Sequence, residues 1–175
     1  MAYTTDRTWV PGEVATAAYF NTYLRDNVKW LSTDKPMARC YNTPGQSVNA
    51  SSTTTLTYNT NRFDNASVHS TSSNTNRLTV PSGAGGKWLF GTYTLMPGQA
   101  TVGNYQVSTI RQTGVTTIAA NQVQVVNSAS FGPGMTVVTM WSMTATDWVD
   151  STYFQDGAAA LTFTSQEFWG IWVGI

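Results

Sequence analysis

The side chains capable of covalent chemistry are few in this 175-residue chain. Cys40 is its one cysteine, His69 is its one histidine, and Asp64 lies between them. A thiol, an imidazole and a carboxylate are the parts of a nucleophilic site in which a base activates the thiol. The stretch around His69 is rich in Ser, Thr and Asn, which is typical of a solvated loop, whereas Cys40 lies in a strand that we expect to be buried. We therefore expect an inert core thiol, a surface histidine and no catalytic residue.

Acidic side chains of the C-terminal half form the second candidate set, Asp147, Asp150, Asp156 and Glu167. Paired carboxylates hydrolyse glycosidic bonds, and carboxylate oxygens bind calcium. The spacing of these residues matches no EF-hand loop, and no cysteine and histidine pattern has the spacing of a zinc site. The sequence therefore predicts neither a metal nor a cofactor.

Aromatic residues are abundant, with seven tryptophans in the chain. Such rings stack on sugars and also anchor protein interfaces. Trp141 is expected to alternate inward with Val137 and Met143, in the core or in an interface. Trp148 and Tyr153 lie beside a predicted loop at 146–152, so they are the expected contacts for an external ligand.

The overall composition excludes several classes of protein. Only 10% of the residues are charged, and nine basic side chains balance nine acidic ones. Binding to nucleic acid needs clustered Lys and Arg, so no nucleic-acid partner is expected. The N-terminus lacks the pattern of a signal peptide, and no apolar run is long enough to span a membrane. We expect synthesis in a cytoplasm, without membrane insertion.

Residues 9–31 carry the one clear helical pattern, and Thr16 or Glu13 is the expected start. Apolar positions and one asparagine are spaced 3-4-3-4-3, as in the seam of a coiled coil. This predicted seam consists of Val14, Ala17, Asn21, Leu24, Val28 and Leu31. The stripe predicts self-association, but a helix packed on its own β domain has the same stripe. An N-terminal arm and helix (1–36) therefore precede a head domain (37–175).

From residue 37 onward the pattern changes to the period of two that is typical of strands. Short strands separated by turns are predicted at 38–42, 53–58, 78–81, 88–95, 105–112, 122–126, 136–146, 158–164 and 168–175. This arrangement indicates an all-β sandwich or barrel.

The last predicted strand is apolar on both faces. In a sheet with one solvated face, apolar and polar residues alternate along each strand. This strand does not alternate, so we expect it to be covered on both sides. The sequence predicts the core on one side and another subunit on the other, with an interface at Phe168, Trp169, Ile171, Trp172 and Val173. A central strand covered by the N-terminal helix is the alternative.

The head resembles a known family in the order of four motifs. Leu-Thr-Val-Pro at 78–81 with Gly-Lys-Trp-Leu-Phe at 86–90 is similar to a signature of C1q/TNF-like jelly rolls. Ile-Arg-Gln-Thr-Gly at 110–114, Phe-Gly-Pro-Gly-Met-Thr-Val at 131–137 and Phe-Trp-Gly-Ile-Trp-Val at 168–173 resemble later motifs of that family. Trp88 replaces the usual tyrosine, and Met135 replaces an acidic residue. The resemblance implies a trimeric jelly-roll sandwich over residues 37–175, preceded by an extended arm and one short α-helix.

The N-terminal segment resembles a different pattern. Trp-Val-Pro-Gly-Glu-Val-Ala-Thr-Ala-Ala at 9–18, followed by Asn21 and Leu24-Arg-Asp-Asn27, is similar to the leader of tailed-phage virion proteins. Such leaders occur on minor tail proteins and on head or tail fibres. The resemblance implies a protein that is made in the host cytoplasm and assembled on the virion surface.

These observations together predict a non-enzymatic bacteriophage structural protein. It would be a homotrimeric spike or decoration, anchored to capsid or tail proteins by its N-terminal region. The alternative is a tail adhesin that recognises a host surface glycan or protein. An adhesin would use exposed aromatic and polar loops, with Trp148 and Tyr153 as the first candidates.

Overall fold

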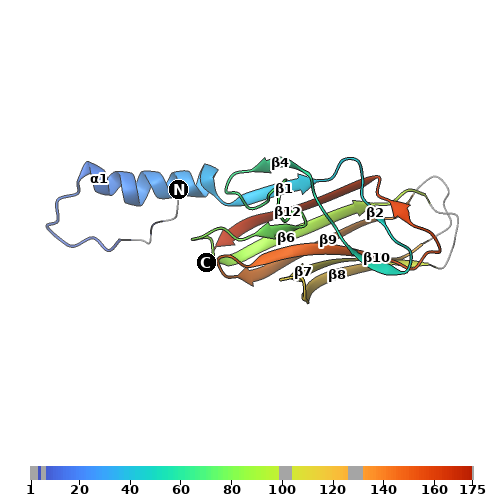
Figure 1. Cartoon of the computed structure of the whole chain (residues 1–175). Helices are drawn as coiled ribbons and strands as arrows, with labels where there is room; N and C mark the ends of the chain where they lie inside the picture. The colour runs from blue at the N-terminus through green and yellow to red at the C-terminus, as the bar shows by residue number, and fades with distance from the viewer. Residues whose placement is uncertain (1–3, 5–6, 99–103, 126–131, 175) are drawn as a thin grey trace.

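The computed structural model describes residues 4, 7–98, 104–125 and 132–174. Two antiparallel sheets form a sandwich, and the N-terminal helical segment projects from one end of it (Figure 1). The first sheet has the strand order β4-β1-β12-β6-β9. The second has the order β3-β10-β7-β8, with β5 also paired to β10. The sequence predicted this fold class, a β-sandwich preceded by one helix.

The strands have the following bounds. In the first sheet they are β4 (Thr60–Asp64), β1 (Met37–Tyr41), β12 (Ser165–Gly174), β6 (Gly86–Leu95) and β9 (Gly134–Met143). In the second sheet they are β3 (Ser52–Thr55), β10 (Trp148–Gln155), β5 (Arg77–Thr79), β7 (Tyr105–Gln112) and β8 (Thr116–Gln124). A separate pair consists of β2 (Ser47–Val48) and β11 (Leu161–Thr162).

Strand β12 is central in the first sheet, between β1 and β6. Phe168 and Trp172 point into the sandwich and are 0% and 5% exposed, whereas Trp169 and Ile171 are half-buried on the opposite face. The strand is therefore buried on its inner side, whereas the predicted cover of its outer side by another subunit stays a prediction. Including Phe168 and Trp172 in an interface is wrong, because these rings fill the core of their own head. Trp169, Ile171 and the exposed Val173 remain candidates.

Strand β10 lies where the sequence predicted a loop at 146–152. Its consecutive residues Asp150, Ser151 and Thr152 are polar but buried. The Asp150 carboxylate accepts a hydrogen bond from the Arg111 guanidinium at 2.6 Å, and the Ser151 hydroxyl pairs with the Tyr58 hydroxyl at 2.6 Å. Buried polar groups are tolerated when they are paired in this way. Such a strand lacks apolar alternation, which is why the pattern did not reveal it.

The helical segment comprises α1 (Ala17–Phe20), η1 (Asn21–Arg25), α2 (Asp26–Lys29) and η2 (Trp30–Asp34), where η1 and η2 are π-helical. The Thr16 hydroxyl accepts a hydrogen bond from the Tyr19 N–H at 3.3 Å, so the predicted N-cap is confirmed. The segment ends at Asp34, slightly beyond the predicted Leu31, just before Pro36. No helix among the described residues is long and apolar enough to cross a membrane.

The arm that precedes the helix lies along one of its faces. A turn at Pro11 and Gly12 reverses the chain: Gly12 has a φ of 85°, and the Glu13 N–H donates to the Val10 carbonyl at 3.0 Å. The Arg7 guanidinium forms an ion pair with Glu13 and lies 3.8 Å from the centre of the Tyr19 ring. The arm is thus attached to the helix it precedes.

The joint between helix and head is built from two tryptophans. Trp30 meets Trp172 edge to face with ring centres 4.5 Å apart, and both side chains are buried. The Trp172 backbone N–H donates to the Pro36 carbonyl at 2.9 Å, and its indole N–H donates to the Gly85 carbonyl at 3.0 Å. These contacts hold the helix in line with the first sheet (Figure 1).

Replacing Asn27 with alanine should release the arm. The Asn27 side chain exchanges two hydrogen bonds with the backbone of Thr4, at 3.0 and 2.9 Å, and it is buried on the helix. Their loss should destabilise the docked arm by about 1–2 kcal/mol. Hydrogen exchange of the amides in 7–16 should therefore become faster. Asn21→Ala is the matched control, because Asn21 is exposed on the same helix, and equal arm protection in both variants would contradict the prediction.

Candidate functional site

The predicted nucleophilic set is not assembled as a site. Cys40 is fully buried, its thiol donates to the Phe168 carbonyl at 3.3 Å, and burial raises the pKa of the thiol. The Asp64 carboxylate accepts hydrogen bonds from the backbone N–H groups of Ala66, Val68 and His69. Asp64 therefore caps a loop, and Cys40 is a core residue that stays in its thiol form.

His69 is buried, which corrects the expected solvated position. Its Nδ1 lies 2.6 Å from the Asn61 side-chain oxygen, and its Nε2 lies 3.2 Å from the Thr75 carbonyl. The ring also meets Tyr58 edge to face. His69 thus joins the loop after β4 to the segment before β5, a structural role that a Ser- and Thr-rich neighbourhood does not reveal.

The four candidate acidic residues act separately. Asp147 accepts hydrogen bonds from Thr144 and Gln112, Asp150 pairs with Arg111, and Asp156 accepts the Tyr105 N–H. Glu167 lies in the first sheet and pairs with two arginines. Within the described part of the chain, no group of three or more His, Cys, Asp or Glu side chains could hold a metal ion.

The two predicted ligand contacts differ in accessibility. Tyr153 is 0% exposed and donates its hydroxyl to Gln106 inside the sandwich, so it cannot touch an external ligand. Burial also raises the pKa of its phenol. Trp148 is half-buried under the Arg77 guanidinium, which lies 5.1 Å from its ring centre. Trp148 remains a prediction, and the selection of Tyr153 is wrong because β10 turns that side chain inward.

The outer side of the first sheet, here called the open face, carries uncovered apolar side chains. Its apolar side chains are half-buried or exposed, and they extend across the sheet from the edge strand β4 to the edge strand β9. They are Met37, Phe63, Leu89, Val138, Met140, Trp169, Ile171 and Val173. Contiguous apolar patches of this kind mark interaction surfaces.

Trp169 dominates the open face because a glycine lets its ring lie flat. Trp169 pairs with Gly91 on β6, and a Cβ at Gly91 would lie 2.1 Å from the indole ring. Any side chain there would therefore push the ring away from the sheet. The ring thus covers the backbone of β6 and gives the face a broad apolar centre.

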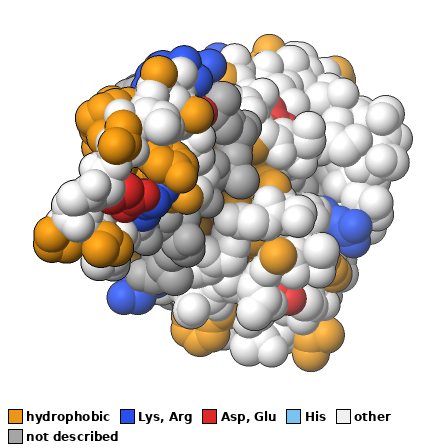
Figure 2. Space-filling view, turned by 90° about the vertical axis from the view of Figure 1, so that its left-hand side faces the viewer, with side chains coloured by type: hydrophobic (Ala, Val, Ile, Leu, Met, Phe, Trp, Pro, Cys, Tyr) orange, Lys and Arg blue, Asp and Glu red, His pale blue; other side chains and the backbone are white. Residues whose placement is uncertain are grey.

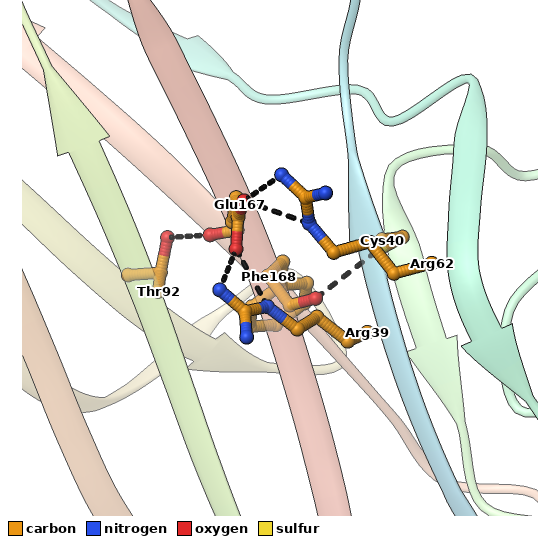
Figure 3. A network of polar contacts seen from close by, with 6 residues as sticks. All are labelled: Arg39, Cys40, Arg62, Thr92, Glu167 and Phe168. Atoms are coloured by element: carbon orange, nitrogen blue, oxygen red, sulfur yellow. Dashed lines mark hydrogen bonds and ion pairs between the residues drawn. The ribbon is translucent and has the colours of Figure 1, made fainter.

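The open face also carries a network of polar contacts between Glu167 and two arginines (Figure 3). Glu167 on β12 receives hydrogen bonds from Arg39 on β1, at 2.6 Å from Nε, and from Arg62 on β4, at 2.9 Å from Nε. The carboxylate side chain is 8% exposed, whereas both arginine side chains are nearly half exposed. The Arg62 guanidinium also lies 4.5 Å from the Tyr41 ring centre. This trio is called the Glu167 network.

The network keeps Glu167 ionised. Burial by itself raises the pKa of the carboxyl group, but the hydrogen bonds and charges of Arg62 and Arg39 outweigh it, so the pKa is lowered. Two guanidinium groups on one carboxylate leave a net charge of about +1 on the part of the open face formed by β4, β1 and β12.

The helix also presents an uncovered apolar stripe. Leu24, Val28 and Leu31 are 52%, 63% and 54% exposed, and Ala17 and Asn21 are exposed as well. The opposite side of the helix carries Tyr19, Tyr23, Asn27 and Trp30, which the arm and the head cover. Hydrophobic side chains therefore gather at the helical end of the molecule (Figure 2). Val14 lies before the first helical residue, so its assignment to the seam is wrong.

Comparison with known proteins identifies the fold. No family model and no curated protein matches the sequence. Among solved structures, the globular domain of zebrafish complement 1qA protein is similar, with a TM-score of 0.57 and 14% identity, over 80% of this chain and 98% of that chain. The head is a C1q-like jelly roll. At this identity the likeness shows the fold alone, and it confirms the fold predicted from the four motifs.

Sequence reasoning missed two parts of the open face of the C1q-like head. Val138 and Met140 on β9 are exposed, although they alternate with buried Met135 and Val137. The Glu167 network was also missed, because its members are distant in sequence and only the strand order β4-β1-β12 brings them together. Both the odd and the even positions of 135–140 include apolar residues, and this pattern was the available signal that β9 has apolar side chains on both of its faces.

His69 should make the stability of the C1q-like head depend on pH. Burial lowers the pKa of its imidazole, which outweighs the raising effects of the Thr75 carbonyl and of Asp64. The unfolded chain then binds a proton more readily than the folded one, so stability is full above about pH 6.5 and falls as the pH drops below it. His69→Gln should flatten this dependence in urea unfolding between pH 7.5 and 5.5. Because the chain has one histidine, an unchanged slope would contradict the prediction.

Proposed function

We propose that this protein is a homotrimeric structural protein of a bacteriophage virion, a spike or decoration that displays a C1q-like head. The observation that carries the proposal is the pair of uncovered apolar surfaces, the helix stripe and the open face. Both are exposed in the single chain, and neither is covered by the arm. A chain with few charges would aggregate through such surfaces unless they met a defined partner.

A single three-fold arrangement of identical chains would cover both the helix stripe and the open face. Parallel helices pack through Ala17, Asn21, Leu24, Val28 and Leu31, and the heads that follow them then meet through their open faces. An asparagine in such a seam fixes the register and the number of helices. The joint of the helix with β12 at Trp30 and Trp172 supports this reading, since it keeps helix and head in one line.

The N-terminal hairpin supports attachment to a particle. Trp9, Val10 and Phe20 are 41%, 64% and 47% exposed at its end, while Arg7 and Glu13 neutralise one another beneath them. The residues that resemble phage virion leaders build this hairpin: Gly12 makes the turn, Glu13 holds Arg7, and Thr16 caps the helix. The proposed partner is therefore a capsid or tail protein with an apolar, uncharged surface.

Light scattering tests the assembly, and labelling of particles tests the location. Purified protein at micromolar concentration should have three times the 19.1 kDa mass of the chain, and a folded monomer would overturn the trimer. Gold-labelled antibody against the head should decorate intact virions. Label over the capsid indicates a decoration, and label at the tail end favours the receptor-binding alternative, with Trp148 as the first residue to mutate. Absence of label on every virion would overturn the phage assignment.

A further inference from the structure

We propose that the interior of the head contains a binding site for buried water at the end remote from the helix, formed by Thr94, Gln106 and Ser108. These three residues lie on strands of both sheets, so the water would link the two sheets. The site belongs to the core of a single head and does not depend on the proposed assembly. Its basis is a change from apolar to polar side chains along the inward-facing side of the strands.

The apolar half of the core lies beside the helix. Trp172 on β12 contacts Trp30 of the helix and pairs with Trp88 on β6. The turn at 144–147 joins β9 to β10 at this same end of the sandwich. Thr94 also faces inward from β6, but it lies six residues beyond Trp88, or roughly 20 Å along the strand. The two ends of the core can therefore be compared strand by strand.

Four strands make the same change between these two ends. Nearer the helix the buried inward-facing side chains are Trp88 and Phe90 on β6, Ile110 on β7, Val149 on β10, and Phe168 and Trp172 on β12. Farther from the helix they are Thr92 and Thr94 on β6, Gln106 and Ser108 on β7, Ser151, Tyr153 and Gln155 on β10, and Gln166 on β12. This second group is called the polar half of the core.

Most side chains of the polar half have hydrogen-bond partners in the protein. Gln166 accepts the Gln46 N–H at 3.1 Å and donates to the Thr57 carbonyl at 2.8 Å. The Thr92 hydroxyl donates to the Glu167 carbonyl at 3.1 Å. Further pairs join Ser151 to Tyr58, Tyr153 to Gln106, and Gln155 to Gly157 and Ala159. Such pairing is the rule for buried polar groups, so any group without a partner needs an explanation.

Three atoms of the polar half break this rule. In the part of the chain that the structure describes, four buried side-chain atoms lack a hydrogen-bond partner, and three of them are Thr94 Oγ1, Gln106 Nε2 and Ser108 Oγ. These residues are 1%, 1% and 0% exposed, so bulk solvent does not reach them. Buried water typically makes about three hydrogen bonds to polar groups that have no other partner. The three atoms match that number.

Strand pairing places the three groups at the same end of the interior. Ser108 is the register partner of Tyr153, and Gln106 lies two residues away on the same side of β7. The Tyr153 hydroxyl donates to the Gln106 side-chain oxygen, which leaves the amide nitrogen to donate elsewhere. Strands β6 and β7 contact each other across the sandwich, and Thr94 is the last inward-facing residue of β6. The short side chains of Thr94 and Ser108 leave space where large apolar side chains fill the other end.

The chemistry of the three groups selects a neutral ligand. The Gln106 amide nitrogen only donates, whereas the hydroxyls of Thr94 and Ser108 donate or accept, so water can satisfy all three. The polar half contains no charged side chain. A halide ion would therefore bring an uncompensated charge into the interior, which costs much more free energy than a neutral molecule that is hydrogen-bonded.

Matched substitutions test the site by the sign of their effect. Thr94→Val and Ser108→Ala should each lower the folding constant roughly 5- to 30-fold, because each removes a hydrogen bond to the buried water. Urea unfolding at one protein concentration measures the change. Thr92→Val and Ser151→Ala are the controls, since these hydroxyls are paired within the protein and their removal should lower stability in any case. If the controls lower stability while Thr94→Val and Ser108→Ala raise it, the two hydroxyls are unpaired and the proposal is wrong.

Crystallography of the wild-type chain gives a direct result. Ordered water should lie within about 3.2 Å of both the Gln106 amide nitrogen and the Ser108 hydroxyl. A second set of crystals, grown with bromide, identifies an anion: anomalous density at this position would overturn the assignment of water. Side chains that pair directly with one another, without density between them, would overturn it as well. Neither result depends on the mass of the assembly, so the proposed function is tested separately.

Discussion

Trp169→Ala should convert the assembly to monomers while the head stays folded. The Trp169 ring is half-buried in the single chain and lies over Gly91, so its removal takes away the apolar centre of the open face and a wall of the hollow that Phe63 and Ile171 also line. Tryptophan at the centre of an interface contributes at least about 2 kcal/mol, which corresponds to a roughly 30-fold weaker association. The midpoint of dissociation, followed by light scattering against dilution, should shift by at least this factor.

The loss of association must be separated from a loss of folding. The far-ultraviolet circular dichroism of Trp169→Ala should match that of the wild type, because the core on the other face of β12 keeps Phe168 and Trp172. Trp141→Ala is the matched control: Trp141 is 37% exposed, but it lies off the open face and donates its indole N–H to Gln112. If both variants stay trimeric at the same dilution, Trp169 is not an interface residue.

Glu167→Gln should destabilise the head at neutral pH by about 2 kcal/mol. The substitution keeps the shape but removes the charge that Arg39 and Arg62 share, and hydrogen bonds to charged groups contribute more than neutral ones. The value lies below that of a fully buried ion pair, because both arginines are nearly half exposed and water screens them. Urea unfolding at pH 7 and at one protein concentration measures the difference.

The effect of this substitution should disappear in acid. Because the folded state lowers the pKa of Glu167, its charge stabilises the fold fully above the unfolded value near 4.5, and this contribution is lost as the pH falls through the folded value. Asp150→Asn is the control, since Asp150 is paired with Arg111 on the second sheet, away from the open face. It should lower stability without changing the oligomeric state. An unchanged difference between wild type and Glu167→Gln at pH 3 would show that the carboxylate charge is not the cause.

Asn27→Ala and His69→Gln probe parts of the molecule that the open face does not include. Asn27 attaches the arm to the helix, and His69 joins two loops of the head. Neither side chain belongs to the helix stripe or to the open face, so neither substitution should change the mass of the assembly. Any change in mass would mean that arm or loop order is coupled to association.

Local sequence patterns predicted the elements of this protein well where one physical signal dominated. The period of two over 105–112 matches β7, Thr16 caps the helix, and the two apolar parities of 168–173 correspond to a strand with apolar side chains on both of its faces. Order and spacing of the four motifs were enough to predict a C1q-like jelly roll. Each of these patterns involves residues that are close together in the sequence, so each can be recognised without knowledge of the tertiary structure.

Tertiary structure decided which of these residues face a partner. Burial of Tyr153, Phe168 and Trp172 depends on the side of the sheet to which each points, which periodicity leaves ambiguous when both parities are apolar. Strand β10 was missed because its polar residues are paired with Arg111 and Tyr58 from distant strands. The Glu167 network and the pocket beside Trp169 likewise join residues that are more than a hundred positions apart. Strand order brings such residues together, and strand order is a property of the whole chain.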